Sequence, residues 1–80
     1  METYALTSKG RPATIGSGQA LRLYEVMEEV GGGPISLDKI VEKCEYRNYA
    51  ALLDTETSVT RSVKHHLGKW VREGYAVRSF

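Results

Sequence analysis

Eighty residues are enough for one domain and no more. The composition, 41% hydrophobic and 26% charged, is that of an ordinary globular domain. No apolar run approaches the roughly 20 residues of a membrane-spanning helix, no signal peptide is evident, and the single Cys44 cannot form an internal disulfide. We therefore expect a cytoplasmic protein that has no membrane partner, and whose small size makes it marginally stable unless it dimerises.

The net charge of +1 hides an uneven division of charge along the chain. Residues 57–80 hold five Lys and Arg against one Glu, a net of +4. Residues 17–56 hold four basic and eight acidic residues, a net of −4. A near-neutral chain with one basic segment is compatible with nucleic-acid binding, and an ordinary solvated helix surface is the alternative interpretation.

Residues 1–16 indicate a strand followed by a basic turn. The β-branched and aromatic residues within 3–7 predict the strand. The next residues, Lys9-Gly10-Arg11-Pro12, contain the Gly-Arg-Pro centre of the AT-hook motif, in which an extended arginine lies in the minor groove of DNA. Three residues are a short motif, so a turn or a flexible arm is the favoured interpretation.

Two helices are predicted next, over residues 17–31 and 36–44. Their apolar residues recur at intervals of three and four, and Ser17 and Ser36 are placed to cap their first turns. The Gly-Gly-Gly-Pro run at 31–34 ends the first helix and lacks the Gly-Lys-Ser/Thr of a phosphate-binding loop. Ile35 is expected to form a one-residue bridge strand, and Cys44 falls on the buried stripe of the second helix.

Residues 45–56 form a connecting segment that is longer than the few residues usual in a helix-turn-helix. Its apolar residues predict a short helical turn over 47–53 that packs on the core, and they leave open a surface for a dimer or another partner: Tyr46, Tyr49, Leu52 and Leu53.

The strongest helix prediction is 57–73. Thr57 or Ser58 is placed to cap it, Gly74 to end it, and residues 75–80 then alternate as a strand. One face of the helix is apolar, with Val59, Val63, Leu67, Trp70 and Val71. The opposite face is cationic, with Arg61, Lys64, His65, Lys69 and Arg72.

Two segments resemble winged helix-turn-helix DNA-binding domains. Ser62-Val63 followed by Leu67-Gly68-Lys69-Trp70-Val71-Arg72-Glu73-Gly74-Tyr75 resembles the recognition helix and first wing strand, with Trp70 in place of the second leucine. Tyr4-Ala5-Leu6-Thr7-Ser8-Lys9-Gly10-Arg11 resembles the end of the second wing strand of MarR-type and PadR-type regulators, where it follows the recognition helix.

The resemblance implies an α+β fold, a three-helix winged helix-turn-helix with a small antiparallel sheet formed by the N- and C-terminal strands. Because the wing motif comes first in this chain, we predict that residues 3–7 pair antiparallel with residues 75–79, as in a winged helix permuted at its wing tip. A disordered N-terminal arm and pairing across a dimer are the alternatives.

The implied function is sequence-specific binding of double-stranded DNA, as a small transcriptional regulator that acts as a homodimer. Arg61 and Lys64 can donate hydrogen bonds to guanine edges. Thr60, Ser62 and Lys69 can contact phosphates. The alternative is a winged-helix module for protein–protein interaction without DNA binding. The DNA-binding residues predicted are Thr60, Arg61, Ser62, Lys64, His65, Lys69, Arg78, Lys9 and Arg11.

Catalysis finds little support in the sequence. The adjacent His65 and His66 point about 100° apart on a helix and do not converge on one metal ion. His66 lies beside the apolar stripe, where a half-buried structural histidine is the usual interpretation. We expect no enzyme activity, no cofactor, no metal and no small-molecule ligand.

Overall fold

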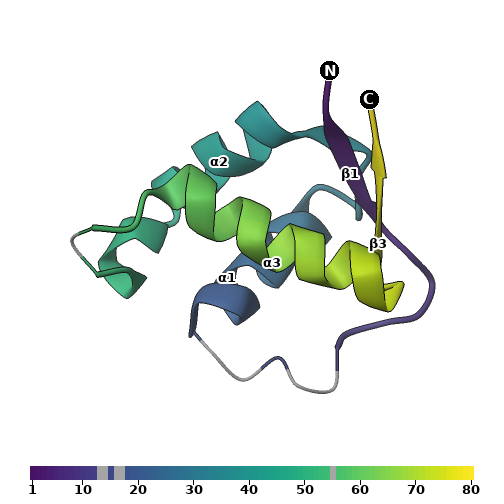
Figure 1. Ribbon diagram of the computed structural model, residues 1–80, viewed down its shortest axis with the longest axis horizontal. Helices are drawn as coiled ribbons and strands as arrows, with labels where there is room; N and C mark the ends of the chain where they lie inside the picture. The colour runs from purple at the N-terminus through teal and green to yellow at the C-terminus, as the bar shows by residue number, and fades with distance from the viewer. Residues whose placement is uncertain (13–14, 16–17, 55) are drawn as a thin grey trace.

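Helices and short strands make up the fold in a computed structural model that describes residues 1–12, 15, 18–54 and 56–80 (Figure 1). Within those residues, three α-helices and one 3-10 turn accompany one three-stranded antiparallel sheet, so the fold is α+β as predicted. No helix in this part of the chain is both long enough and apolar enough to cross a membrane. The elements in chain order are β1 (Thr3–Leu6), α1 (Gly18–Glu29), β2 (Ile35–Ser36), α2 (Leu37–Tyr46), η1 (Tyr49–Leu52), α3 (Val59–Glu73) and β3 (Ala76–Ser79).

The first strand of the chain is the central strand of the sheet, whose order is β2-β1-β3. β1 pairs antiparallel with β3 from Thr3 opposite Ser79 to Leu6 opposite Ala76. The predicted pairing of the two terminal strands is therefore confirmed, and it forms within one chain. Ile35 also pairs with β1 as part of β2, so the expected bridge strand is confirmed. The two ends of the chain consequently lie side by side (Figure 1).

The helices begin and end at residues with clear capping roles. The Ser36 and Ser58 hydroxyls accept hydrogen bonds from the backbone N–H groups of Lys39 and Arg61, so Ser58, and not Thr57, caps α3. Gly74 ends α3 with φ of +85°, a left-handed conformation that glycine adopts without strain. The predicted cap of α1 at Ser17 lies outside the described residues.

The glycine run after α1 packs tightly against β1. The carbonyl of Gly32 accepts a hydrogen bond from the Leu6 N–H at 2.6 Å. A Cβ on Gly33 would lie 2.5 Å from the Tyr4 carbonyl oxygen, closer than real Cβ atoms come. Glycine is therefore required at position 33, because the connection to β2 passes directly over the backbone of β1.

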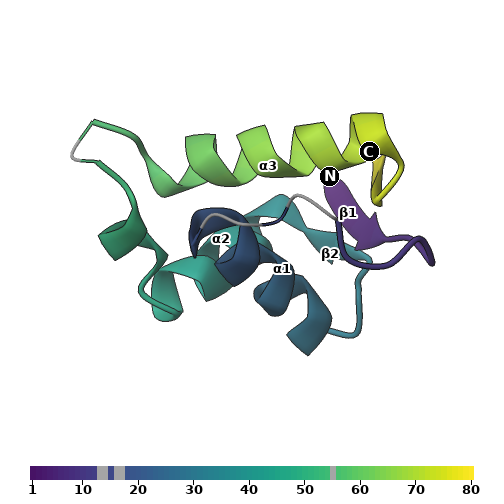
Figure 2. The same ribbon diagram turned by 90° about the horizontal axis from the view of Figure 1, so that it is seen from below.

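The core lies between α3 on one side and α1 and α2 on the other (Figure 2). Trp70 is only 3% exposed, and its ring meets the Tyr24 ring edge to face at a centroid distance of 5.6 Å. Cys44 is fully buried, and burial raises the pKa of its thiol to about 12, so it is a core residue as predicted. The two tyrosines of the connecting segment differ in burial. Tyr49 in η1 is fully buried in the core as predicted, whereas Tyr46 is exposed, so its expected core packing is wrong.

Candidate nucleic-acid interface

The outer face of α3 is a row of exposed polar and cationic side chains. Within the described residues, none of its Lys or Arg side chains forms an ion pair. Elsewhere Arg11, Lys39 and Arg47 each pair with a glutamate. The α3 cations therefore remain available to an anionic partner. We call the exposed residues of this row the α3 outer face: Thr60, Arg61, Lys64, His65, Lys69 and Arg72.

Gly68 lies in the middle of the α3 outer face. Lys64 is one turn before it and Arg72 one turn after it. A Cβ at position 68 would meet only the Arg72 Nη1 atom, at 3.7 Å, so packing within the chain does not require glycine there. Glycine costs an exposed helix roughly 0.5–1 kcal/mol relative to alanine. Because Gly68 has no side chain, a partner could approach the helix backbone closely at this point, between Lys64 and Arg72.

The predicted DNA contact at Ser62 is wrong, because Ser62 is only 5% exposed and faces the core. Its hydroxyl donates to Gln19 Oε1 at 3.1 Å, so the Tyr49 hydroxyl must donate to Ser62 Oγ at 2.9 Å. The Gln19 amide nitrogen in turn donates to the Leu52 carbonyl at 2.8 Å. This buried network joins α1, η1 and α3, and it sets the rotation of α3 against the rest of the domain.

An open hollow of about 310 Å³ lies beside the first turns of α3. No carboxylate lines it, and the Gln19 Oε1 atom at its wall lies 3.4 Å from His66 Nε2. The two histidine rings meet edge to face, with centroids 5.3 Å apart. We call this cavity the α3 hollow; its lining residues are Gln19, Thr57, Arg61, Ser62, His65 and His66.

The two histidines of the α3 hollow have different environments. His65 is exposed and His66 is half-buried. Burial lowers the pKa of His66, and the nearby His65 and Lys69 lower it further. His66 is therefore more readily neutral than a free histidine at neutral pH, and an anion beside it would favour its protonated form.

Asp54 orders the chain just before α3. Its carboxylate accepts hydrogen bonds from the hydroxyl and the N–H of Thr57 and from the N–H of Glu56. The hydrogen bond from the Thr57 side chain, followed by those from the two backbone N–H groups, lowers the pKa of the Asp54 carboxyl. This turn holds Thr57 at the rim of the α3 hollow.

Lys9 and Arg11 contact their own domain, and residues 8–9 form a turn, which is one of the two structures expected for this segment. The Lys9 ammonium donates to the Glu73 carbonyl at 2.8 Å and lies 4.4 Å from the centroid of the Tyr75 ring. Arg11 pairs with Glu28 at 2.8 Å and lies over the Tyr24 ring. Both side chains remain exposed, but neither is free of a partner on its own chain.

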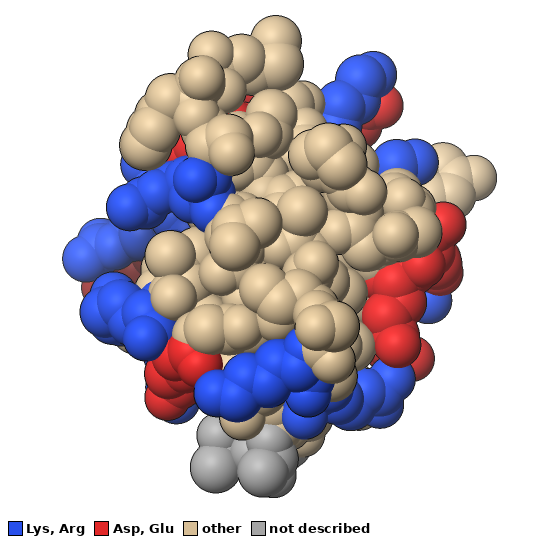
Figure 3. Space-filling view, turned by 90° about the vertical axis from the view of Figure 1, so that its right-hand side faces the viewer, with Lys and Arg blue, Asp and Glu red and all other residues tan. Residues whose placement is uncertain are grey.

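The sheet side of the molecule has a largely uncharged centre. Figure 3 shows Lys and Arg gathered along the left edge, the side of α3, and across the bottom of this view. The predicted DNA contact at Arg78 lies on this side on β3, exposed, with its guanidinium carbon 5.5 Å from the centroid of the Phe80 ring. Arg78 therefore lies on the strand that follows α3 and is not part of the α3 outer face.

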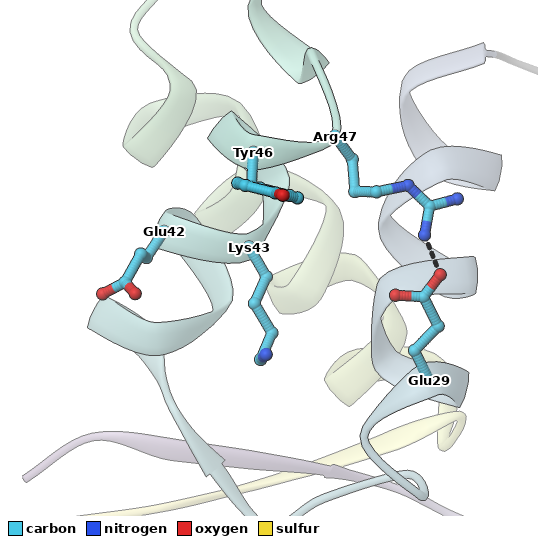
Figure 4. A pocket seen from close by; sticks show the side chains of 5 residues that line it. All are labelled: Glu29, Glu42, Lys43, Tyr46 and Arg47. Carbon is cyan, nitrogen blue, oxygen red and sulfur yellow. Dashed lines mark ion pairs between the residues drawn. The ribbon is translucent and has the colours of Figure 1, made fainter.

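A second hollow, of about 550 Å³, lies between the ends of α1 and α2 (Figure 4). Tyr46, 91% exposed, stands beside it, and an ion pair between Arg47 and Glu29 crosses it. The other lining residues are Glu42 and Lys43, so the charges are mixed and none belongs to α3. We call this cavity the Tyr46 hollow.

Comparison of the chain with protein-family models, curated proteins and solved structures found no match. Among the described residues, no three His, Cys, Asp or Glu side chains are grouped so that they could hold a metal ion. The geometry of the α3 outer face therefore carries the functional argument.

Sequence reasoning missed Gln19 and Gly68 as parts of this site. Gln19 had no distinguishing signal, since it meets Ser62 and His66 only through the packing of α1 on α3. Gly68 had one: a glycine in the middle of a helix, flanked on both sides by residues that favour helix, is unusual without a local reason.

Proposed function

We propose that this protein binds double-stranded DNA through the α3 outer face, as a small transcriptional regulator of winged-helix type. The observation that carries the proposal is the set of exposed cations on α3, none of which has a carboxylate partner in the part of the chain that the structure describes. A helix fits the major groove, where each base pair presents its own pattern of donors and acceptors. Four Lys and Arg side chains on one helix face supply the phosphate attraction that dominates DNA affinity.

The position of each side chain on α3 suggests its role. Lys64 and Thr60 lie one and two turns before the open backbone at Gly68, so they are the candidates for contact with base edges. Lys69 and Arg72 lie toward the end of the helix and suit phosphates. Arg61 lines the α3 hollow with other polar groups, which favours phosphate contact over the guanine contact expected from the sequence.

The arrangement of elements supports the winged-helix interpretation. α3 is the last helix, it lies along one side of the molecule, and a strand of the sheet follows it directly (Figure 2). β1 pairs antiparallel with β3, and this is the pairing that a wing permuted in chain order would need. A homodimer would place two copies of α3 in successive half-sites and so multiply specificity.

A titration of mixed-sequence duplex DNA at several salt concentrations tests the proposal. If about four phosphates are neutralised, log affinity should fall against log salt with a slope of about −3.6. Lys69→Ala should flatten this slope by about one unit, because it removes one phosphate contact.

Lys43→Ala is the matched control for this titration. Lys43 is also exposed and without an ion pair among the described residues, but it lies on α2 in the Tyr46 hollow. Its replacement should leave the slope unchanged. A salt-independent response, or equal effects of the two substitutions, would argue against binding through α3.

A protein-interaction module is the second candidate function, and one observation favours it. Tyr46 is 91% exposed beside a hollow of mixed charge, the kind of aromatic residue that anchors protein interfaces. A chain that fails to bind DNA at moderate concentration would direct attention to this surface.

A further inference from the structure

We propose that the α3 hollow is a phosphate-binding site whose affinity rises as His65 and His66 become protonated. Where the phosphate belongs to DNA, the inference rests on the function proposed above, and it assigns one backbone phosphate to a defined pocket. The same chemistry would take a free phosphate or sulfate ion. The two sources are separated by experiment below.

The charge and shape of the α3 hollow point to an anion. The cavity of about 310 Å³ is open to solvent, and its lining combines the Arg61 guanidinium and two imidazoles. The Thr57 hydroxyl also lines it, but its hydrogen is already donated to the Asp54 carboxylate at 2.8 Å. No carboxylate is among the described residues that line it, and the acidic group next to the lining is Asp54, which accepts hydrogen bonds from Thr57. Hydrogen bonds from charged donors to phosphate are about twice as strong as neutral ones.

The pocket is held in shape before any ligand enters. The Gln19 amide nitrogen donates to Leu52, so its Oε1 atom must face Ser62 and His66 as an acceptor. His66 Nε2 therefore donates to Gln19, which fixes the tautomer of the neutral ring with hydrogen on Nε2. Protonation then adds a hydrogen at Nδ1 and a full positive charge to a ring that is already positioned.

The surroundings of His66 make its charge depend on the ligand. Burial, and then the neighbours His65 and Lys69, disfavour a positive charge on His66. Among the described residues that line a hollow with His66, Glu73 is the one carboxylate. The described residues from outside α3 that line a hollow with His66 are uncharged: Pro12, Ile15, Gln19, Ala20 and Thr57. A phosphate would offset the local positive charge, so phosphate binding and proton uptake favour each other by linkage.

A change of affinity with pH can be traced to the α3 hollow, because this chain has only two histidines and both line that hollow. Histidine is the side chain whose charge ordinarily changes between about pH 5 and pH 8. If each histidine gains one proton on binding, log affinity should rise by up to about one per pH unit for each of them as the pH falls.

The test has two arms that use the full chain. In the first, DNA affinity is measured between about pH 5.5 and pH 8 at constant salt for the wild type, His65→Gln and His66→Gln. Glutamine keeps a donor for Gln19 but cannot become charged. We expect the wild type to bind more tightly at low pH, each variant to lose part of this dependence, and the double variant to lose nearly all of it.

In the second arm, sodium sulfate is titrated into labelled protein while the imidazole resonances of both histidines and the side-chain amide of Gln19 are followed by NMR. Sulfate keeps its charge across this range, so only the protein titrates. We expect these resonances to shift together, more strongly at low pH, and sulfate to raise the apparent pKa of His66. Arg61→Gln should weaken the response, whereas Lys43→Gln should not.

The outcomes separate the two proposals. DNA binding that is insensitive to pH and to both histidine substitutions, with no sulfate response, would overturn the phosphate pocket and leave the proposed function standing. A sulfate response without DNA binding would support the pocket as a site for a free phosphate and overturn DNA as its source. The absence of both DNA binding and a sulfate response would overturn both proposals.

Discussion

At the residue scale, α3 combines positions that serve stability with positions that serve a partner. Trp70 and Leu67 are buried and join the helix to the core, whereas Gly68 between them contributes nothing to packing. Natural binding sites often keep residues that lower stability because a partner needs the space. If the proposed function holds, Gly68 is such a residue, since packing within the chain does not require it.

Gly68→Ala should stabilise the domain and weaken its binding to DNA. Alanine has the higher helix propensity, and its methyl group would make only an ordinary contact with Arg72, so we expect a gain of about 0.5–1 kcal/mol in the free energy of unfolding. Denaturant unfolding and a DNA titration on the same preparation measure both effects. Stabilisation with unchanged DNA affinity would mean that no ligand approaches the helix backbone at this position.

At the element scale, the C-terminal end of α3 is completed by a segment far away in sequence. The Thr7 hydroxyl donates to the Gly74 carbonyl at 2.7 Å, and the Lys9 ammonium donates to the Glu73 carbonyl at 2.8 Å. A cation at this end also opposes the negative end of the helix dipole. Lys9, which the sequence assigned to DNA, therefore supports the helix that carries the proposed DNA-binding face.

Lys9→Met should lower stability and leave DNA affinity nearly unchanged. Methionine retains much of the aliphatic chain over Tyr75 but loses the hydrogen bond and the charge at the helix end, for which we expect a cost of about 0.3–1 kcal/mol. Thermal unfolding at low and high salt is the measurement, since the charge component is screened by salt. A loss of DNA affinity without loss of stability would return Lys9 to the list of DNA contacts.

At the scale of the whole molecule, the sheet joins the first and last strands of the chain, β1 and β3. β1 is the central strand, so the first residues of the chain hold the last strand and β2 together. Tyr4, 1% exposed, extends this closure into the core. Because β1 makes contacts with segments both about 30 and about 70 residues away, much of the structure must form before β1 can pair.

Hydrogen exchange should find the backbone amides of Leu6 and Thr7 among the slow ones in the protein. Their N–H groups donate to Gly32 and Tyr75, so we expect both to exchange only when most of the domain opens. Native-state exchange followed by NMR measures this directly. Rapid exchange at both residues, with slow exchange in α1 and α3, would indicate an N-terminal arm that pairs only weakly with the domain.

Local sequence patterns predicted much of the fold. Apolar spacing placed the three helices within two residues at each end, because period and capping residues act over one or two turns. The wing motif at the start of the chain predicted the pairing of β1 with β3, and periodicity placed Trp70 in the core.

The candidate site depended on tertiary structure where its residues meet across elements. Periodicity identified the cationic face of α3, but Ser62 lies near the edge of the apolar stripe, and only the packing of Tyr49 and Gln19 against it turned its hydroxyl inward. From the sequence Lys9 is a cation without a predicted partner, whereas in the structure the position of β1 places it at the end of α3. The sequence by itself determined which residues are apolar, charged or capping, since those properties are local. The tertiary structure decided which polar groups have partners within the chain, because partners about 40 or more residues apart meet only in the folded domain.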